Sequence, residues 1–243
     1  MKQVLFVVAL MFVVSAHAQD AKTLYNEGIK LKGEKKSAEA LEKFKKAVSL
    51  KADYYDAIYE IGWCQNDLKQ YPLAMSNLRK ARIGWPTIPK VHFELGYAFE
   101  KQGLTDSAKA SYKRCLELKP DYSLAHKQLG TIAYDKNLYP EGLMHFDNYI
   151  KYAGSAGKEI TDYLFWYRKG FMENAEKKYT MAKESLQKSL LYKKDYINTY
   201  LELGFACTKQ KEDDNAINWF TQAMTIDPKS HIPYNGIAEV YRD

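Results

Sequence analysis

The sequence predicts an all-α fold, a right-handed superhelical solenoid of antiparallel helix pairs, with about six pairs and a C-terminal capping helix. Three observations predict it. Glycines recur in a fixed register, a second ladder of small residues runs beside them, and apolar side chains around both ladders fall at helical intervals. Glycine and proline are few, 13 and 7 among 243 residues, and no run of residues has the pattern of a strand bounded by turns.

The first ladder is a row of glycines that recur at one constant interval, with a single longer step between the fourth and the fifth. Its members are Gly28, Gly62, Gly96, Gly130, Gly170 and Gly204, and Ala238 continues the series. A glycine inside a helix costs about 1 kcal/mol relative to alanine. A glycine repeated at one register therefore indicates a place where two helices must approach closely.

The second ladder has the same spacing and predicts the second helix of each pair. Its members are Ala40, Ala74, Ala108, Gly142, Ala182 and Ala216. A large apolar residue follows each of them four positions later, namely Phe44, Leu78, Tyr112, Phe146, Leu186 and Phe220. One such pair cannot bury its apolar face alone, so we expect the pairs to stack on one another.

The clearest copies of this pattern are "LGYAFEKQG…AKASYKRCLELKP" in 95–120 and "LGFACTKQ…AINWFTQAMTIDP" in 203–228. They resemble the tetratricopeptide repeat, a 34-residue helix pair with a small residue in the first helix and an Ala-x3-aromatic pattern in the second. The resemblance covers residues 21–243. It implies the solenoid fold and a concave groove, lined by the first helices, that is the usual ligand surface of the family. Such a fold says little about the particular function.

The N-terminal segment from Met1 to Ala18 is typical of a secretory signal peptide. Lys2 precedes an apolar run from Val4 to Val14, and small residues end at Ala18, so we expect cleavage between Ala18 and Gln19. The run is too short to span a bilayer, which takes ~20 residues. We therefore expect an exported protein, periplasmic or secreted, with no transmembrane segment in the mature chain.

The longer step between Gly130 and Gly170 divides the expected domain organisation. Units 1–4 are expected over 19–156, and a joint, units 5–6 and the capping helix over 157–243. The six extra residues lie in "YAGSAGKEITD", 152–162. They form either a hinge between the two groups of units or a longer first helix in the fifth unit.

Charge and cysteine usage exclude some function classes. The net charge of +6 is mild, and the Lys-rich stretch 30–46 also carries glutamates. This favours a solvated helical face over a polyanion or membrane-surface patch, and we expect no nucleic-acid partner. Cys64, Cys115 and Cys207 match no metal or redox spacing. They are expected as buried free thiols, with one disulfide and one leftover thiol as the alternative.

A catalytic interpretation finds no support in the motifs. His92 and His126 occupy equivalent places one repeat apart, ~10 Å, too far to share a zinc ion whose ligands lie at ~2 Å. We expect core histidines there, and place His145 and His231 in no cluster. Glycine-rich phosphate loops, nucleophile elbows and metalloprotease motifs are absent. We therefore expect no enzyme, no cofactor and no metal site.

Residues three before and one after each ladder glycine are expected to face the groove. The candidates are the aromatic residues at these positions, Lys127 three before Gly130, and Tyr134 four after Gly130. They are Tyr25, Tyr59, Trp63, Phe93, Tyr97, Lys127, Tyr134, Tyr167, Phe171 and Phe205. The alternative is that these aromatic side chains only pack between units. A family clamp for acidic C-terminal carboxylates uses a Lys and an Asn, but Lys127 is followed by Thr131 in the Asn place. An apolar or aromatic-rich segment is therefore the expected ligand.

Three hypotheses of function follow. The first is a non-enzymatic exported adaptor that binds a protein or peptide segment in its groove, in a bacterial envelope complex. The second is a chaperone-like factor that transiently holds exported or unfolded client chains. The third is an enzyme with an unrecognised site, to which no residue is assigned.

Overall fold

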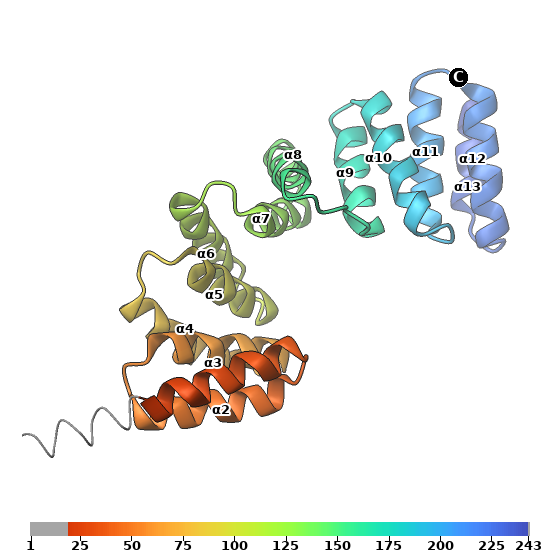
Figure 1. Cartoon of the computed structure of the whole chain (residues 1–243). Coiled ribbons are helices and arrows are strands. Elements are labelled where there is room, and N and C mark those ends of the chain that lie inside the picture. Colours follow the sequence, from red (N-terminus) through yellow and green to blue (C-terminus); the bar gives the residue numbers. More distant parts are fainter. Residues whose placement is uncertain (1–18, 243) are drawn as a thin grey trace, which may run out of the picture. The chain divides into compact units, whose positions relative to one another are not determined.

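The computed structural model describes residues 19–242, and the expected signal peptide over 1–18 lies outside them. Within 19–242 every regular element is a helix, and successive helices pack in pairs (Figure 1), so the expected all-α fold of stacked helix pairs is confirmed. The chain divides into two compact units, 1–125 and 126–243, with the division inside α7, Ser123–Asp135.

The first unit contains a helix over residues 19–33 and five further complete helices. These are α2 (Ser37–Leu50), α3 (Tyr55–Asp67), α4 (Tyr71–Gly84), α5 (Pro89–Lys101) and α6 (Thr105–Leu118). From α2 onward, each helix packs against the next one along the chain, and the first helices α3 and α5 also touch each other.

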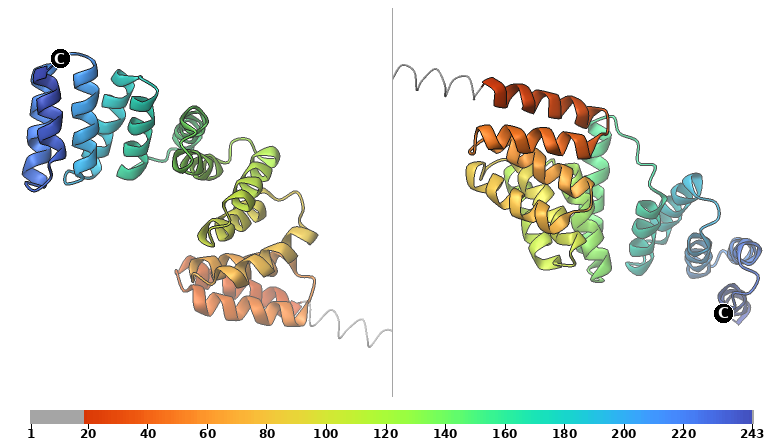
Figure 2. Two further views of the ribbon diagram at one scale, coloured as in Figure 1. Left: turned by 180° about the vertical axis from the view of Figure 1, so that it is seen from behind. Right: turned by 90° about the horizontal axis from the view of Figure 1, so that it is seen from below.

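The second unit continues the same arrangement (Figure 2). After α7 come α8 (Tyr139–Ser155), α9 (Tyr163–Ala175), α10 (Tyr179–Tyr192), α11 (Ile197–Lys209), α12 (Asp213–Ile226) and α13 (Ile232–Arg242). The first helices α9, α11 and α13 contact one another in order. The last of them, α13, also packs on α12 and buries Pro233 and Val240, as a capping helix does.

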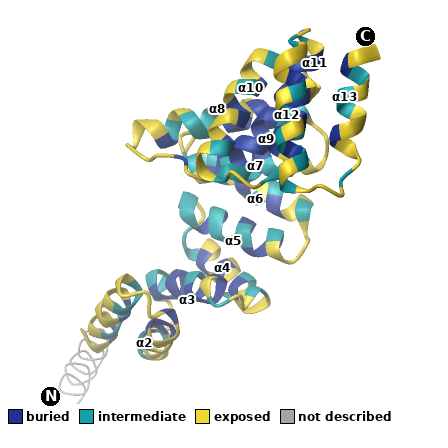
Figure 3. Cartoon of the chain, turned by 90° about the vertical axis from the view of Figure 1, so that its right-hand side faces the viewer, coloured by how far each residue is buried: buried dark blue, intermediate teal, exposed yellow. Residues whose placement is uncertain are grey.

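The ladder glycines let each pair close. A Cβ atom added to Gly96 would lie 2.8 Å from the ring of Tyr112, and one added to Gly62 would lie 2.5 Å from Cγ of Leu78. Real Cβ atoms do not approach neighbours so closely, so each glycine makes room for the large residue of the second ladder. Those large residues form the core of each pair, and Figure 3 shows buried residues on the faces that helices turn to one another.

The turn inside each pair repeats one backbone conformation. One residue of each turn adopts a positive φ, and the residues concerned are Lys35, Lys69, Gly103, Asn137, Lys177 and Lys211. They follow the same register as the ladders. A left-handed residue just after a helix brings its backbone N–H groups back to the last carbonyls, which ends the helix and reverses the chain.

The six extra residues lengthen a second helix and the connection that follows it. The first helix α9 has 13 residues, like α3, α5 and α11, so the expectation of a longer first helix is wrong. The second helix α8, however, has 17 residues, three more than the 14 of the second helix α10. Ile160 in the connection is buried and its carbonyl accepts a hydrogen bond of 2.8 Å from Nε1 of Trp166. Small residues such as Gly154 and Gly157 allow helix and loop alike, so the pattern did not reveal where the helix ends.

Two glycine substitutions in the second unit test the packing role of the ladder. Gly170→Ala places a Cβ 2.5 Å from Cγ of Leu186, and we expect it to lower the free energy of unfolding by about 1–3 kcal/mol. Gly154→Ala is the control, because Gly154 lies in α8 with nothing within 4 Å of the new atom. It should raise the free energy of unfolding by up to about 1 kcal/mol through helix propensity. Urea denaturation followed by circular dichroism measures both, and equal shifts in one direction would contradict the packing role.

Candidate functional site

A cavity of ≈ 710 Å³ opens along the first helices of the second unit. Its apolar lining includes Phe171 from α9, Leu201 and Phe205 from α11, Phe220 from α12 and Ile232 from α13. Phe205 and Ile232 are exposed, by 37% and 52%. The position of this cavity on α9, α11 and α13 makes it a candidate for a ligand site.

The register of the ladder explains why phenylalanines line this cavity. Gly170 and Gly204 face the second helices of their own pairs, since added Cβ atoms would meet Leu186 and Phe220. The next residue in a helix is turned by about 100° from the glycine, so Phe171 and Phe205 lie on the flank away from the tightest contact. Both were expected on the groove from the sequence.

Polar groups in the cavity are held by contacts between successive repeats. Nδ2 of Asn174 donates to the backbone oxygen of Glu202 at 3.0 Å and to its Oε2 at 2.8 Å. Burial raises the pKa of the Glu202 carboxyl, and the hydrogen bond from Asn174 opposes this rise. Lys209 forms an ion pair of 3.1 Å with Glu239 across α11 and α13.

The first unit carries the same polar contact. Nδ2 of Asn66 donates to the backbone oxygen of Glu94 at 3.0 Å and to its Oε2 at 2.9 Å. Trp63 and Tyr97 stand where Phe171 and Phe205 stand in the second unit. Burial raises the pKa of Glu94 to about 7, although the hydrogen bond from Asn66 and the positive charge of Lys32 both act to lower it.

Both contacts belong to one register that the sequence interpretation did not anticipate. The residue four after a ladder glycine meets the residue two before the next ladder glycine. The same register gives the ion pair between Lys32 and Glu60, 2.5 Å, and the stacking of Arg168 over the ring of Tyr134, 5.6 Å. The signal was present as polar residues at both positions, but the expected groove consisted of residues three before and one after each glycine, with Tyr134 alone at four after.

The predicted aromatic residues three before each glycine pack between repeats. Tyr59 and Tyr167 are only 5% and 8% exposed. The ring of Tyr167 lies 5.0 Å from that of Tyr196, where the next first helix begins. Tyr25 and Phe93 make the equivalent contacts, with Tyr54 at 5.2 Å and Tyr122 at 5.1 Å. Tyr59 and Tyr167 therefore leave little surface for a ligand, whereas Tyr25 and Phe93 are half-buried.

None of the predicted aromatic residues one after each glycine is fully buried. Trp63, Tyr97 and Phe171 are half-buried and Phe205 is exposed. Nζ of Lys32 lies 3.8 Å from the centre of the Trp63 ring. Tyr134, also half-buried, meets the Phe171 ring edge-on at 5.6 Å. The four rings one after each glycine lie in the same helices as the asparagines and glutamates of the polar contacts.

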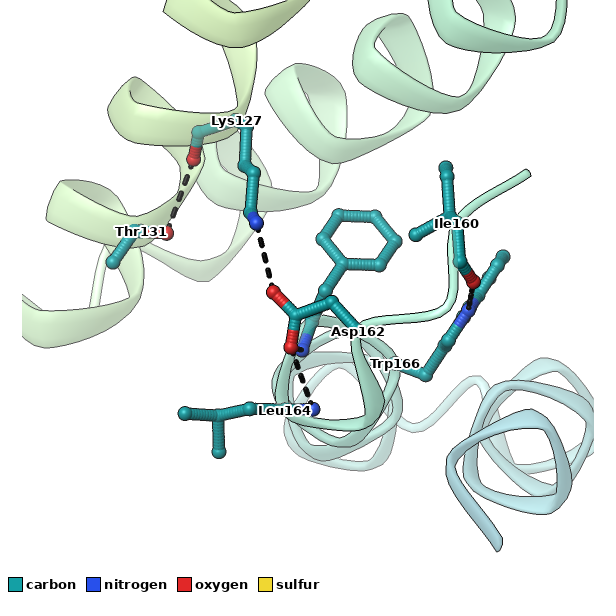
Figure 4. Close-up of polar contacts among 7 residues, drawn as sticks. Lys127, Thr131, Ile160, Asp162, Leu164 and Trp166 are labelled. Atoms are coloured by element: carbon teal, nitrogen blue, oxygen red, sulfur yellow. Dashed lines mark hydrogen bonds and ion pairs between the residues drawn. The ribbon is translucent and has the colours of Figure 1, made fainter. Parts of the chain in front are cut away.

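Lys127 has a structural partner, which Figure 4 shows. Its Nζ lies 2.7 Å from Oδ2 of Asp162. Asp162 is the N-cap of α9, and its Oδ1 accepts from the backbone N–H groups of Leu164 and Phe165 at 3.0 and 3.3 Å. Lys127 thus ties α7 to the start of α9.

The expectation of buried core histidines at positions 92 and 126 is confirmed. His92 and His126 are buried, and Pro86 provides a backbone oxygen 2.8 Å from Nε2 of His92. The expectation that His145 belongs to no cluster is wrong, because its Nδ1 lies 3.0 Å from Nδ1 of His126. The two residues lie on the two helices of one pair, a relation that the comparison of first helices alone could not find.

The three cysteines are buried and free, as expected. Burial raises the pKa of the Cys64 and Cys115 thiols to about 12 and that of Cys207 to about 11, which makes all three poor nucleophiles. No group of three or more metal-ligating side chains gathers within residues 19–242. Over the same residues, no helix has both the length and the apolar character needed to cross a membrane.

The buried carboxyl of Glu94 predicts a pH dependence of stability. Because its pKa is about 7 in the folded chain and 4.5 ordinarily, the folded state prefers the protonated carboxyl. The protonated carboxyl therefore adds its full contribution to the free energy of unfolding below about pH 4.5. This contribution is lost as the pH rises through about 7. Glu94→Gln keeps the acceptor for Asn66 and cannot ionise, so it should raise the free energy of unfolding by about 1–3 kcal/mol at about pH 8 and change it little at about pH 4.

Urea titrations at the two pH values measure this difference. Glu39→Gln, which changes an exposed carboxyl in the first turn of α2, is the control and should show no comparable gain at the higher pH. A Glu94→Gln effect that is equal at both pH values would contradict the assignment.

Comparison with known proteins agrees with this geometry. A family model for the tetratricopeptide repeat matches residues 89–122 and 197–230, the segments that contain the clearest copies of the pattern. No curated protein matches the chain. Solved structures match most of the chain. Their sequence identities are low, so these matches show a similar fold and nothing further.

Three of these structures show the extent of the likeness. PilF of Pseudomonas aeruginosa matches with a TM-score of 0.69 and 14% identity over 92% of this chain and 99% of its own. YrrB, described as a tetratricopeptide-repeat protein with an unusual peptide-binding site, has a TM-score of 0.69 and 12% identity over 79% and 96%.

The Cut9–Hcn1 hetero-tetramer of the APC/C has a TM-score of 0.63 and 18% identity over 96% of this chain. The chain spans 45% of the length of the matched chain in that assembly. Two segments of this protein thus match the tetratricopeptide-repeat model, and its helix pairs have the fold of solved tetratricopeptide-repeat proteins.

Proposed function

We propose that this protein is a non-enzymatic, exported adaptor that binds a peptide or protein segment along α9, α11 and α13. The observation that carries the proposal is the cavity of ≈ 710 Å³ on these first helices. Its volume is within the range of ligand-binding clefts, and its apolar floor is bordered by a few oriented polar groups. Tetratricopeptide-repeat proteins act through such contacts with other proteins.

The composition of the cavity favours binding over catalysis. Among the described residues, its lining contains no serine, threonine, cysteine or histidine. Its two acidic side chains have structural partners, because Glu202 accepts from Asn174 and Glu239 pairs with Lys209. Phe171 and Phe205 offer ring faces that an apolar or aromatic residue of a bound segment can cover. YrrB, with the same fold, is described as having a peptide-binding site, which makes this use of the fold physically reasonable.

Affinity measurements with a groove variant test the proposal. The protein captures its partner from an envelope extract, and the purified partner is then titrated against Phe171→Ala/Phe205→Ala. Because aromatic anchors dominate such interfaces, we expect a loss of affinity of tenfold or more. The control is Met181→Ala/Leu191→Ala, which removes exposed apolar side chains of α10 outside the cavity and should leave the affinity unchanged.

Two results would contradict the adaptor. Equal affinity of the groove variant and the control would exclude this cavity as the binding site. Weak capture of many unrelated chains, together with suppression of their aggregation, would instead indicate the chaperone-like factor.

We also infer that the chain is exported, on the strength of the segment from Met1 to Ala18. Expression of the full sequence in a bacterial host should yield a periplasmic protein that begins at Gln19, which intact-mass measurement detects. Val8→Arg interrupts the apolar run and should leave the full-length chain in the cytoplasm, whereas Gln3→Lys lies outside the run and should be processed normally. A chain that keeps this segment in every fraction would rule out the inference.

A further inference from the structure

The two units contain the same constellation of four residues. In the first unit these are Trp63, Asn66, Glu94 and Tyr97, and in the second unit they are Phe171, Asn174, Glu202 and Phe205. The asparagine and the glutamate are 28 residues apart in each, and each aromatic pair is one repeat apart. The hydrogen bonds have closely matching lengths, 3.0 and 2.9 Å in the first unit against 3.0 and 2.8 Å in the second.

Each constellation leaves one buried acceptor without a partner. Asn66 and Asn174 are each 4% exposed. The amide nitrogen of each donates to glutamate oxygens, so the side-chain oxygen of the asparagine needs a donor from elsewhere. Within residues 19–242 neither Oδ1 atom has one. Thr208 occupies the same register and is satisfied by its own helix, donating to the Gly204 oxygen at 3.0 Å, so the fold itself does not require an open acceptor.

The glutamates are equally without a positive partner. Neither Glu94 nor Glu202 forms an ion pair with a residue in 19–242. Around Glu94 stand Asn66, Lys32 and Glu60, and Lys32 is already paired with Glu60 at 2.5 Å. Around Glu202 the cavity holds Asn174, Lys177, Lys209 and Glu239, and Lys209 is paired with Glu239 at 3.1 Å.

A junction nearer the N-terminus indicates which ligand this register accepts. There Lys32 takes the place of the asparagine, Glu60 that of the glutamate and Trp63 that of the second aromatic residue. The ammonium of Lys32 lies 2.5 Å from Oε2 of Glu60 and 3.8 Å from the centre of the Trp63 ring. At that junction the chain supplies its own cation between a carboxylate and an aromatic face.

We propose that the two Asn–Glu constellations are equivalent subsites, each of which binds a cationic side chain, arginine or lysine, of a partner segment. The inference deepens the proposed function and rests on it. A guanidinium or ammonium group would donate to the carboxylate and to the open asparagine oxygen, while the neighbouring rings cover its flat or apolar surface. The ligand would thus combine basic and apolar residues. Its charge would be opposite to that of an acidic C-terminal tail.

Synthetic peptides provide the probes. One peptide has a central arginine between leucines and serines, a second replaces the arginine with citrulline, which keeps the shape without the charge, and a third replaces it with glutamate. Each is titrated calorimetrically into the protein at about pH 8, where a carboxyl with the pKa of Glu94, about 7, is mostly ionised. We expect the arginine peptide to bind about tenfold more tightly than the citrulline peptide, the glutamate peptide to bind most weakly, and two arginine peptides to bind per chain.

Conservative variants assign the two subsites. Glu202→Gln and Glu94→Gln each keep an acceptor for the asparagine and remove the negative charge, so each should reduce the stoichiometry of tight arginine binding from two to one. The double variant should bind arginine and citrulline peptides equally. Glu184→Gln, in an exposed part of α10, is the matched control and should change nothing.

The outcomes separate this inference from the proposed function. Equal affinity for arginine and citrulline peptides would overturn the cationic subsites, and the adaptor would still stand if Phe171→Ala/Phe205→Ala loses its partner. One arginine peptide per chain, lost in Glu202→Gln and kept in Glu94→Gln, would overturn the equivalence of the two subsites. If neither the Phe171→Ala/Phe205→Ala variant nor the Glu→Gln variants lose binding, the groove is not the binding site.

Discussion

Every repeat is built around the close contact between a ladder glycine and the large side chain opposite it. Gly62 receives Leu78, Gly96 receives Tyr112 and Gly204 receives Phe220, each so closely that an added Cβ atom would force the neighbouring side chain to shift. This contact sets the separation and the rotation of the two helices in a pair. Because the contact recurs in each pair, every other position of the first helix acquires a constant environment, either against the second helix, between repeats, or on the open flank.

The constant environment explains how one register carries different chemistry. The position four after a glycine and the position two before the next are neighbours, and they hold a lysine with a glutamate, an asparagine with a glutamate, or a tyrosine with an arginine. The scaffold positions the pair, and the residue types decide whether its charge is compensated inside the chain. Compensation is complete for Lys32 and Glu60 and incomplete for the two asparagine junctions, and that difference separates a structural contact from a candidate recognition element.

Aromatic residues divide in the same way. Tyr59 and Tyr167 are buried against the following repeat, whereas Phe205 lies open in a cavity, although all three were equal candidates in the sequence. A residue three before a glycine lies where successive first helices meet, and a residue one after it lies on the outer flank. Lys127 shows the related case of a polar candidate whose charge is used within the fold, by the N-cap Asp162.

The helix pairs, the glycine contacts and the buried cysteines could all be predicted from the amino-acid sequence, because a constant repeat interval and helical spacing specify which face of each helix is apolar. The contacts between polar side chains of different helices could not be predicted in this way. Asn174 and Glu202 are 28 residues apart, and His126 and His145 are 19 apart on two helices of one pair. Periodicity within one helix says where a side chain points, but the neighbour it finds depends on how the next helix is stacked, which is a property of packing between elements.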